Sequence, residues 1–212
     1  MEDHSCWRCG STESDSLFCQ YCNSLQAPVS DYYRFFGIEK KLSLDPAELQ
    51  SRFYALSRQL HPDLYTRANP AEQRHSLEAA SILNDGYRVL RDPVLRAEYI
   101  LKENQFEEGE ERSRDVPPEL LEEVFELNMQ LDELRSGDMD ARDPLAESEG
   151  RFKAMLSGID ADLQRLFSAY DAAAEGEPRR VELARIRTLL DRRRYVRNLV
   201  TEVDKVLAEH AS

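Results

Sequence analysis

Apolar residues recur at helical spacing on either side of a Pro-containing segment in the first half of the 212-residue chain. Asp45 is a favourable helix cap and Pro46 suits a first helical position, so the pattern predicts a helix over 46–60. Pro62 ends it. A second helix is predicted over 71–91, and its apolar face is expected to carry Leu77, Ala80, Leu83, Tyr87 and Leu90. The two helices should form an antiparallel hairpin.

Two features interrupt this pattern. Gly86 lies inside the second helix, where glycine is expected to cost roughly 0.5–1 kcal/mol relative to alanine. Asp92-Pro93 then breaks the period and opens a short helix that should run to about Lys102. The first half of the chain is therefore expected to be a compact helical unit.

Three longer amphipathic stretches follow Pro117-Pro118. The first has an apolar stripe of Leu120, Val124, Leu127, Leu131 and Leu134. The second, from Phe152 to Tyr170, repeats at alternating spacings of four and three, which favours coiled-coil-like packing. After a loop between Ser136 and Pro144 and a turn at 176–178, the last helix should occupy about 179–209. Three helices with short loops predict a three-helix bundle.

Charge and composition limit the classes of partner and the cellular compartment that we expect for this protein. Charged residues make up 33% of the chain and the formal net charge is -13. An acidic protein repels phosphate groups, so we expect neither nucleic acid nor an anionic membrane as a partner. No apolar run approaches the roughly 20 residues of a membrane-spanning helix. The first residues resemble neither a secretory signal nor a transit peptide, so we expect a cytoplasmic protein with reduced thiols.

All four cysteines lie in residues 1–30, in two C-x-x-C motifs separated by nine residues. Four soft thiolates at this spacing suit a tetrahedral metal ion, and zinc is favoured. Disulfides conflict with the expected compartment, and a redox C-x-x-C is usually single and close to a βαβ unit. We therefore predict one structural zinc ion per chain, with all its positions filled by Cys6, Cys9, Cys19 and Cys22.

The tripeptide His61-Pro62-Asp63 directly follows the first predicted helix. Pro62 restricts His61 to extended geometry, so the loop should present an imidazole and a carboxylate at the tip of the hairpin. A carboxylate held this way suits an arginine on a partner. A three-residue match also occurs by chance in turns, and the tripeptide alone leaves both interpretations open.

The context of the tripeptide resembles a known family. Asp31–Ile38 before it, with Asn84–Leu90 and Asp92-Pro93 after it, resemble a J domain, the co-chaperone module that stimulates ATP hydrolysis by DnaK-type chaperones. Arg96–Leu101, an acidic linker and the helical bundle resemble the HscB-type iron–sulfur cluster co-chaperones. The four-cysteine segment is similar to a zinc-binding extension found on some members.

The resemblance implies an all-α fold, with a helical-hairpin J domain and a C-terminal three-helix bundle behind a small zinc-ribbon-like segment. The expected divisions are a zinc-binding segment, a J domain, an acidic linker and a client-binding bundle, at 1–30, 31–103, 104–116 and 117–212.

The resemblance also implies two partners and no catalysis by the chain itself. A DnaK-type chaperone would dock on His61, Pro62 and Asp63, with Arg52 and Arg58 on the preceding helix. An iron–sulfur cluster scaffold protein would bind apolar residues of the bundle's first and last helices, here Leu121, Phe125 and Tyr195. Antiparallel packing of those two helices would let the three side chains share one surface.

The sequence departs from the family in two places. Arg52 and Arg58 against Glu48 give the helix over 46–60 only a weak basic excess, which bears on docking strength. Gly86 stands where alanine is usual, which we expect to affect stability only.

Several alternatives remain beside this interpretation. Leu121 and Phe125 adjoin the core stripe and could simply widen it. The eight arginines between 179 and 197 favour a solvated helix face over a docking patch. An enzyme using His61 and Asp63 would lack a nucleophile, a phosphate-binding loop and an open metal position. A zinc-ribbon nucleic-acid binder would need a basic N-terminal segment, but residues 1–30 contain only Arg8 against four acidic residues. A general J-domain co-chaperone for unfolded clients is the nearest alternative, and it would need a broad apolar cleft or a Gly/Phe-rich linker, neither of which the sequence indicates.

Overall fold

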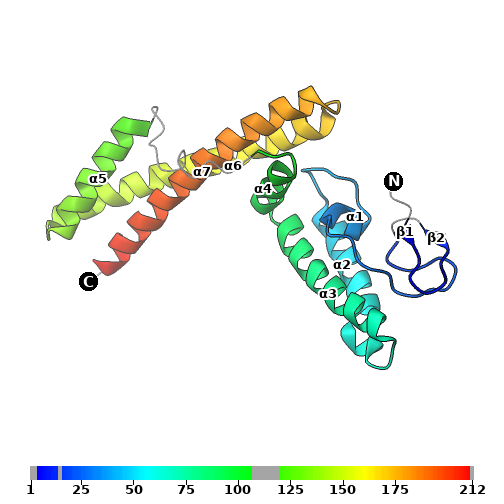
Figure 1. The fold of residues 1–212 in the computed structure, drawn as a ribbon. Coiled ribbons are helices and arrows are strands. Elements are labelled where there is room, and N and C mark those ends of the chain that lie inside the picture. The colour runs from blue at the N-terminus through cyan, green and yellow to red at the C-terminus, as the bar shows by residue number, and fades with distance from the viewer. Residues whose placement is uncertain (1–3, 14–15, 107–119, 211–212) are drawn as a thin grey trace. The chain divides into compact units, whose positions relative to one another are not determined.

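The structure is a computed structural model that describes residues 4–13, 16–106 and 120–210. The chain divides into two compact units, Met1–Tyr99 and Ile100–Ser212 (Figure 1). Helices make up most of the described residues, and the strands β1 (His4–Ser5) and β2 (Thr12–Glu13) form one small antiparallel pair in the cysteine segment. The predicted all-α class, with a small ribbon-like segment at the N-terminus, is confirmed.

The first unit contains the predicted hairpin. It consists of α1 (Tyr32–Phe36), α2 (Pro46–Leu60), the one-turn 3-10 helix η1 (Pro62–Tyr65) and α3 (Pro70–Arg91), while α4 (Pro93–Glu103) continues into the second unit. Side-chain caps explain the starts of these helices, because the Asp45 carboxylate accepts hydrogen bonds from the first turn of α2 and Asn69 does the same for α3. The helices predicted over 46–60, 71–91 and 93–102 are thus confirmed.

The face that α3 buries differs from the expected one. Leu77 is 61% exposed, so its place on the apolar face was wrong. The buried row of α3 consists of Ser76, Ala79, Leu83, Gly86 and Leu90. Its spacing is helical, but Ser76 and Gly86 carry no hydrophobic signal. Ser76 is buried because its hydroxyl donates to the carbonyl of Leu60 at 2.7 Å, which joins the end of α2 to α3.

Gly86 is required by the packing of α1 against α3. A Cβ atom at this position would lie 2.9 Å from a ring carbon of Tyr32 and 3.0 Å from one of Phe36. Tyr32 has little room to yield, because its ring stacks on Tyr99 with centroids 4.8 Å apart. The expectation that glycine only costs stability here is therefore corrected: the missing side chain lets two helices approach closely.

Replacing Gly86 with alanine is expected to lower the free energy of unfolding by about 1–3 kcal/mol, because overpacking outweighs the gain in helix propensity. Gly150→Ala in the second unit is the matched control, since nothing lies within 4 Å of its added Cβ. That control should gain about 0.5–1 kcal/mol instead. Urea unfolding followed by circular dichroism measures both changes, and equal gains in the two variants would contradict the packing argument.

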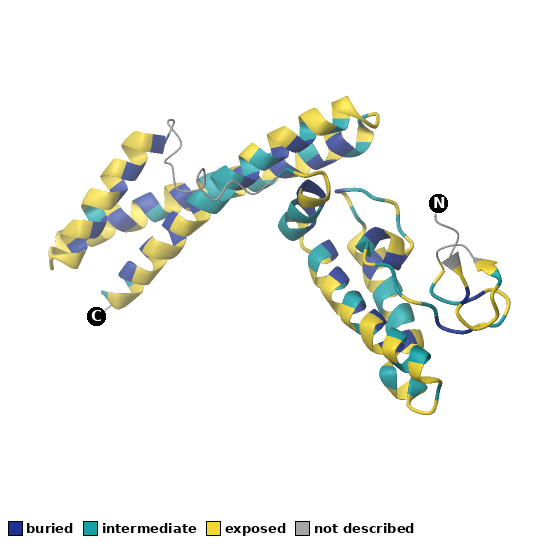
Figure 2. Cartoon of the chain, in the orientation of Figure 1, coloured by how far each residue is buried: buried dark blue, intermediate teal, exposed yellow. Residues whose placement is uncertain are grey.

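The second unit is a bundle of α5 (Leu121–Arg135), α6 (Arg142–Ala172) and α7 (Glu177–Glu209), with the 3-10 turn η3 (Met139–Ala141) between the first two. Figure 1 shows α6 and α7 side by side as a long hairpin, with α5 against the part where α6 begins. The predicted stripe on α5 is buried throughout, as the dark blue positions in Figure 2 illustrate. The predicted three-helix bundle is confirmed.

Two expectations about the linking segments have different outcomes. The loop predicted up to Pro144 is shorter than expected, because α6 begins at Arg142 and the proline occupies its first turn, where no backbone N–H is needed. The acidic linker at 104–116 lies largely outside the described residues, as does Pro117-Pro118. The four-part division of the chain stays a prediction.

Helices α6 and α7 are long, with 31 and 33 residues. Within the described ranges, none of the helices combines such length with enough apolar character to cross a membrane.

Candidate functional site

The His61-Pro62-Asp63 loop lies between α2 and α3, where Pro62 starts the 3-10 helix η1. The side chains of His61 and Asp63 are 57% and 85% exposed. His61 Nδ1 accepts a hydrogen bond from the backbone N–H of Asp63 at 3.3 Å, and a carboxylate oxygen of Asp63 lies 3.6 Å from the same nitrogen. Because Nδ1 caps the backbone, the proton of the neutral ring is on Nε2. Both polar groups are therefore accessible to a partner.

Hydrogen bonds within the loop hold its backbone in place. The N–H of Leu64 donates to the carbonyl of His61 at 3.0 Å, and that of Ala68 donates to Tyr65 at 2.9 Å. The Tyr65 hydroxyl donates to the carbonyl of Gln59 at 2.9 Å, which connects η1 to the last turn of α2. Burial, together with the charge of nearby Glu72, raises the pKa of Tyr65.

Helix α3 also holds the loop. The side-chain amide of Gln73 donates to the carbonyls of Thr66 and Ala68, at 3.2 and 3.0 Å. Thr66 in turn donates its hydroxyl to the carbonyl of Asp63 at 3.2 Å. The loop is thus fixed from both ends, which lowers the entropy that it would lose on binding a partner. Gln73 was not among the sequence predictions, because its role depends on the path of the loop.

The two arginines predicted to assist docking have different surroundings. Arg52 donates to the carboxylate of Glu48 at 2.9 Å and to the carbonyls of Phe36 and Gly37 at 3.3 and 3.1 Å. Its guanidinium therefore ties α2 to the end of α1. Arg58 is exposed. The contribution of both residues to docking stays a prediction.

The four cysteines converge as their spacing predicts. Their sulfur atoms all lie within 4.8 Å of one another. The sulfurs of Cys6 and Cys22 are 3.6 Å apart and those of Cys9 and Cys19 are 3.7 Å apart. Four thiolates around a tetrahedral zinc at 2.3 Å would have sulfurs about 3.8 Å apart. The geometry therefore fits a single tetrahedral metal ion.

The surroundings of these sulfurs favour the thiolate form. Backbone N–H groups of Arg8 and Cys9 point to the Cys6 sulfur at 3.4 and 3.5 Å. Burial raises the pKa of Cys6, but hydrogen bonds from Cys9, Ser24 and Arg8 outweigh it and lower the value to about 6. The Ser24 hydroxyl is also the main cause that lowers the pKa of Cys22. Thiolates are the form that binds metal, so the chemistry of the donor set agrees with its geometry.

The outer face of α5 carries an apolar stripe. Leu121 is 56% exposed and Phe125 is 65% exposed, so the alternative that they widen the core is wrong. Met129, one further turn along, is 49% exposed and extends the same row. Met129 was not among the residues predicted from the sequence, although its spacing of four from Phe125 was the available signal. We call Leu121, Phe125 and Met129 the α5 stripe.

Tyr195 is half-buried on α7, and burial raises its pKa. Helices α5 and α7 both run antiparallel to α6 and therefore parallel to each other (Figure 1), so the antiparallel packing under which the three side chains would share one surface does not occur. Arg135 pairs with Glu202 at 2.8 Å near the end of α5. Seven residues back along each helix, about 10 Å, lie Asn128 and Tyr195. Tyr195 is thus level with the stretch between Phe125 and Met129.

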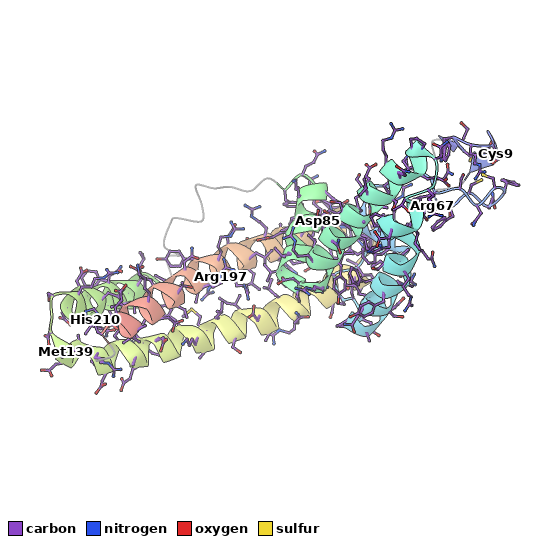
Figure 3. All side chains as sticks on the ribbon, turned by 90° about the horizontal axis from the view of Figure 1, so that it is seen from below. Cys9, Arg67, Asp85, Met139, Arg197 and His210 are labelled. Carbon is purple, nitrogen blue, oxygen red and sulfur yellow. The ribbon has the colours of Figure 1, made fainter. Side chains whose placement is uncertain are left out.

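The arginine-rich part of α7 is largely neutralised by its own chain. Arg187 pairs with Asp191 at 3.0 Å, Arg185 with Glu182 at 2.9 Å, and Arg193 with Asp160 of α6 at 2.5 Å. Arg179 lies over the ring of Tyr170, 5.4 Å from its centroid. Arg197, labelled in Figure 3, is exposed. These contacts favour the interpretation as a charge-balanced helix face.

Two family models match the chain. The DnaJ domain model matches residues 31–99, and the model of the HSCB C-terminal oligomerisation domain matches residues 116–204. The first match contains the His-Pro-Asp loop, and the second contains the α5 stripe.

Individual relatives agree with these models. The human iron-sulfur cluster co-chaperone protein HscB is 28% identical over 204 residues, which covers 93% of this chain and 80% of the relative. A co-chaperone protein HscB homolog of Vibrio vulnificus is 33% identical over 138 residues, covering 63% of this chain and 80% of the relative. The crystal structure of human HscB superposes with a TM-score of 0.71 at 26% identity, covering 95% and 97% of the two chains. The chain therefore belongs to the HscB family of iron–sulfur cluster co-chaperones, and it combines their J domain and C-terminal helical domain with a four-cysteine site positioned to bind a metal ion.

Proposed function

We propose that this protein brings an iron–sulfur cluster scaffold protein to a DnaK-type chaperone and stimulates ATP hydrolysis by that chaperone. The observation that carries the proposal is the His61-Pro62-Asp63 loop, exposed and fixed by hydrogen bonds within a J domain. The α5 stripe supplies a second surface, on the other unit of the chain. Membership of a family of iron–sulfur cluster co-chaperones supports a role in cluster assembly.

The chaperone would dock on the loop through polar contacts. The Asp63 carboxylate can accept charge-assisted hydrogen bonds from an arginine of the chaperone, and His61 offers an Nε2–H donor. Arg58 and Arg52 would add positive charge along α2. The chemical step takes place in the chaperone, and this chain has the role of positioning the chaperone's elements rather than of catalysis.

The scaffold protein would bind the α5 stripe, with Tyr195 contributing from α7. Exposed apolar side chains gathered on one helix face are typical of a protein interface. Glu122 and Glu126, both exposed, lie beside the stripe. A partner with an apolar patch and basic residues at its edge would complement this face.

Zinc is the metal that we propose for the four cysteines. Four thiolates in tetrahedral arrangement, with no position left for a substrate, are typical of a structural zinc site. Bound zinc would link the two C-x-x-C motifs, which have little apolar mass of their own to hold them together.

The decisive experiment measures ATP hydrolysis by a DnaK-type chaperone as this chain is added, with and without the scaffold protein. Stimulation by the chain, increased further by the scaffold, is the expected result. Failure to stimulate the chaperone would contradict the proposal. Stimulation increased by unfolded model clients but not by the scaffold would favour a general J-domain co-chaperone instead.

One zinc ion per chain is the expected result of elemental analysis of the purified protein. Removing it with a chelator should unfold the segment around the cysteines, because so small a segment folds only with its ion. Most of the helical circular dichroism signal should persist, because that signal comes from α2 to α7. A protein without stoichiometric metal, or with disulfides formed inside cells, would contradict the zinc assignment.

A further inference from the structure

The four-cysteine segment contacts α3 at Leu25 and Trp7. The Leu25 side chain is buried, and its backbone is held on both sides. Its N–H donates to a carboxylate oxygen of Glu72 at 3.4 Å. Its carbonyl accepts from the Trp7 indole at 2.8 Å and from Nδ1 of His75 at 3.2 Å. The rings of Trp7 and His75 also meet edge to face, with centroids 6.2 Å apart.

Leu25 is joined directly to the cysteine cluster. The preceding residue, Ser24, is fully buried, and its hydroxyl lies 3.0 Å from the Cys22 sulfur and 3.6 Å from the Cys6 sulfur. Gln26, the following residue, donates to the same hydroxyl oxygen at 2.8 Å, which directs the Ser24 proton towards the sulfurs. The position of Leu25 therefore depends on the arrangement of the cysteines.

The first two turns of α3 contact Leu25 and also hold the His61-Pro62-Asp63 loop. Glu72 and His75 contact Leu25, while Gln73 between them donates to the loop carbonyls of Thr66 and Ala68. Glu72 also lies close enough to Tyr65 of η1 for its charge to act on the tyrosine hydroxyl. Figure 3 labels Cys9 and Arg67, which mark the cysteine segment and the loop within this unit.

We propose that the four-cysteine segment positions the His61-Pro62-Asp63 loop, and that Glu72 and His75 are the positioning residues that connect the two. Leu25 fixes the first two turns of α3 from one side, and Gln73 fixes the loop from the other. The inference rests on the docking role proposed above for the loop. It gives the metal-binding extension a part in chaperone docking.

Amide hydrogen exchange on the full chain tests the structural part of this inference. The amides of Leu64 and Ala68 report on the loop, because both donate to carbonyls within it. Removing zinc should speed their exchange roughly two- to tenfold, the effect of weakening one or two hydrogen bonds. The amide of Leu127 in α5 serves as the internal control and should not change. Faster exchange confined to residues 5–26 would overturn the inference.

Substitutions at Glu72 separate positioning from general stability. Glu72→Ala removes the acceptor for the Leu25 N–H and should speed loop exchange in the zinc-loaded protein. Glu72→Gln keeps an oxygen acceptor and should behave like the parent. If Glu72 acted only through its negative charge at the start of α3, both variants would lose its effect, because alanine and glutamine are both uncharged. Equal behaviour of the two variants would therefore overturn the inference.

Chaperone stimulation provides the functional measurement. Glu72→Ala, or zinc removal, should raise the protein concentration needed for half-maximal stimulation and leave the maximal rate unchanged. Unchanged half-maximal concentrations would overturn the inference. Absence of stimulation by the zinc-loaded parent would instead contradict the docking role itself, and the exchange measurement would still decide whether the segment positions the loop.

Discussion

Replacing Asp63 with asparagine is expected to abolish stimulation of the chaperone ATPase while leaving the fold intact. The carboxylate is 85% exposed, so the free energy of unfolding should change by less than about 1 kcal/mol. At the docked surface, the loss of charge leaves an arginine of the chaperone without its partner, which costs about 2–5 kcal/mol. His61→Gln should have the same outcome, because the imidazole cap and its Nε2–H are both lost. Titrating the chaperone ATPase with each variant, beside a thermal melt, measures the two effects.

Asp85→Asn is the matched control for this prediction. Asp85, labelled in Figure 3, is an exposed aspartate on α3 of the same J domain. It pairs weakly with Arg88 at 3.6 Å. Its replacement removes the same charge at a distance from the loop and should leave stimulation unchanged. If Asp63→Asn and His61→Gln both stimulate ATP hydrolysis as the parent does, the docking site is wrongly placed.

The double substitution Leu121→Ala with Phe125→Ala is expected to weaken scaffold binding by about 3–5 kcal/mol. Each side chain would contribute roughly 1.5–3 kcal/mol when buried against the partner. The dissociation constant for the scaffold should therefore rise by a factor on the order of a hundred to several thousand. Calorimetric titration against the scaffold measures this loss. Stimulation of the chaperone without the scaffold should not change, because the loop belongs to the other unit.

Two equally exposed methionines can test how far the proposed scaffold-binding surface extends along α5. Met129 on the α5 stripe and Met139 in η3 are both 49% exposed. Met129→Ala should weaken scaffold binding by about 1–2 kcal/mol, whereas Met139→Ala should bind as the parent does. A double Leu121/Phe125 variant that binds the scaffold normally would refute the site, and a much lower melting temperature in that variant would show that these exposed side chains stabilise the fold instead.

Local signals in the sequence determined most of the helices correctly. Asp45, Asn69 and Asp92 each precede a proline and cap a helix with their side chains, so these starts depend only on neighbouring residues. The buried face of α3 was harder to predict. Ser76 and Gly86 are buried because of the carbonyl of Leu60 and the rings of α1, and both partners come from other elements. Hydrophobic periodicity carries no information about such contacts.

The candidate sites also include features that the local sequence predicts and features that depend on contacts between distant elements. The cysteine spacing predicted a tetrahedral cluster, because two C-x-x-C turns leave four sulfurs few other arrangements. The exposure of Phe125 could not be decided from the sequence, since it depends on where α6 and α7 cover α5. The contact of Leu25 with Glu72 and His75 was also not predictable, because it joins residues about 50 positions apart without a sequence motif.

The contact between Trp7 and the Leu25 carbonyl also has a practical consequence. Trp7 is the only tryptophan in the chain, and it is held where the cysteine segment meets α3. Excitation of its indole at wavelengths too long for tyrosine to absorb therefore selects one junction in a protein that has nine tyrosines. The chain thus contains a native fluorophore for this junction. Its emission would follow detachment of the cysteine segment in real time, without an added dye and with little background from the helical bundle.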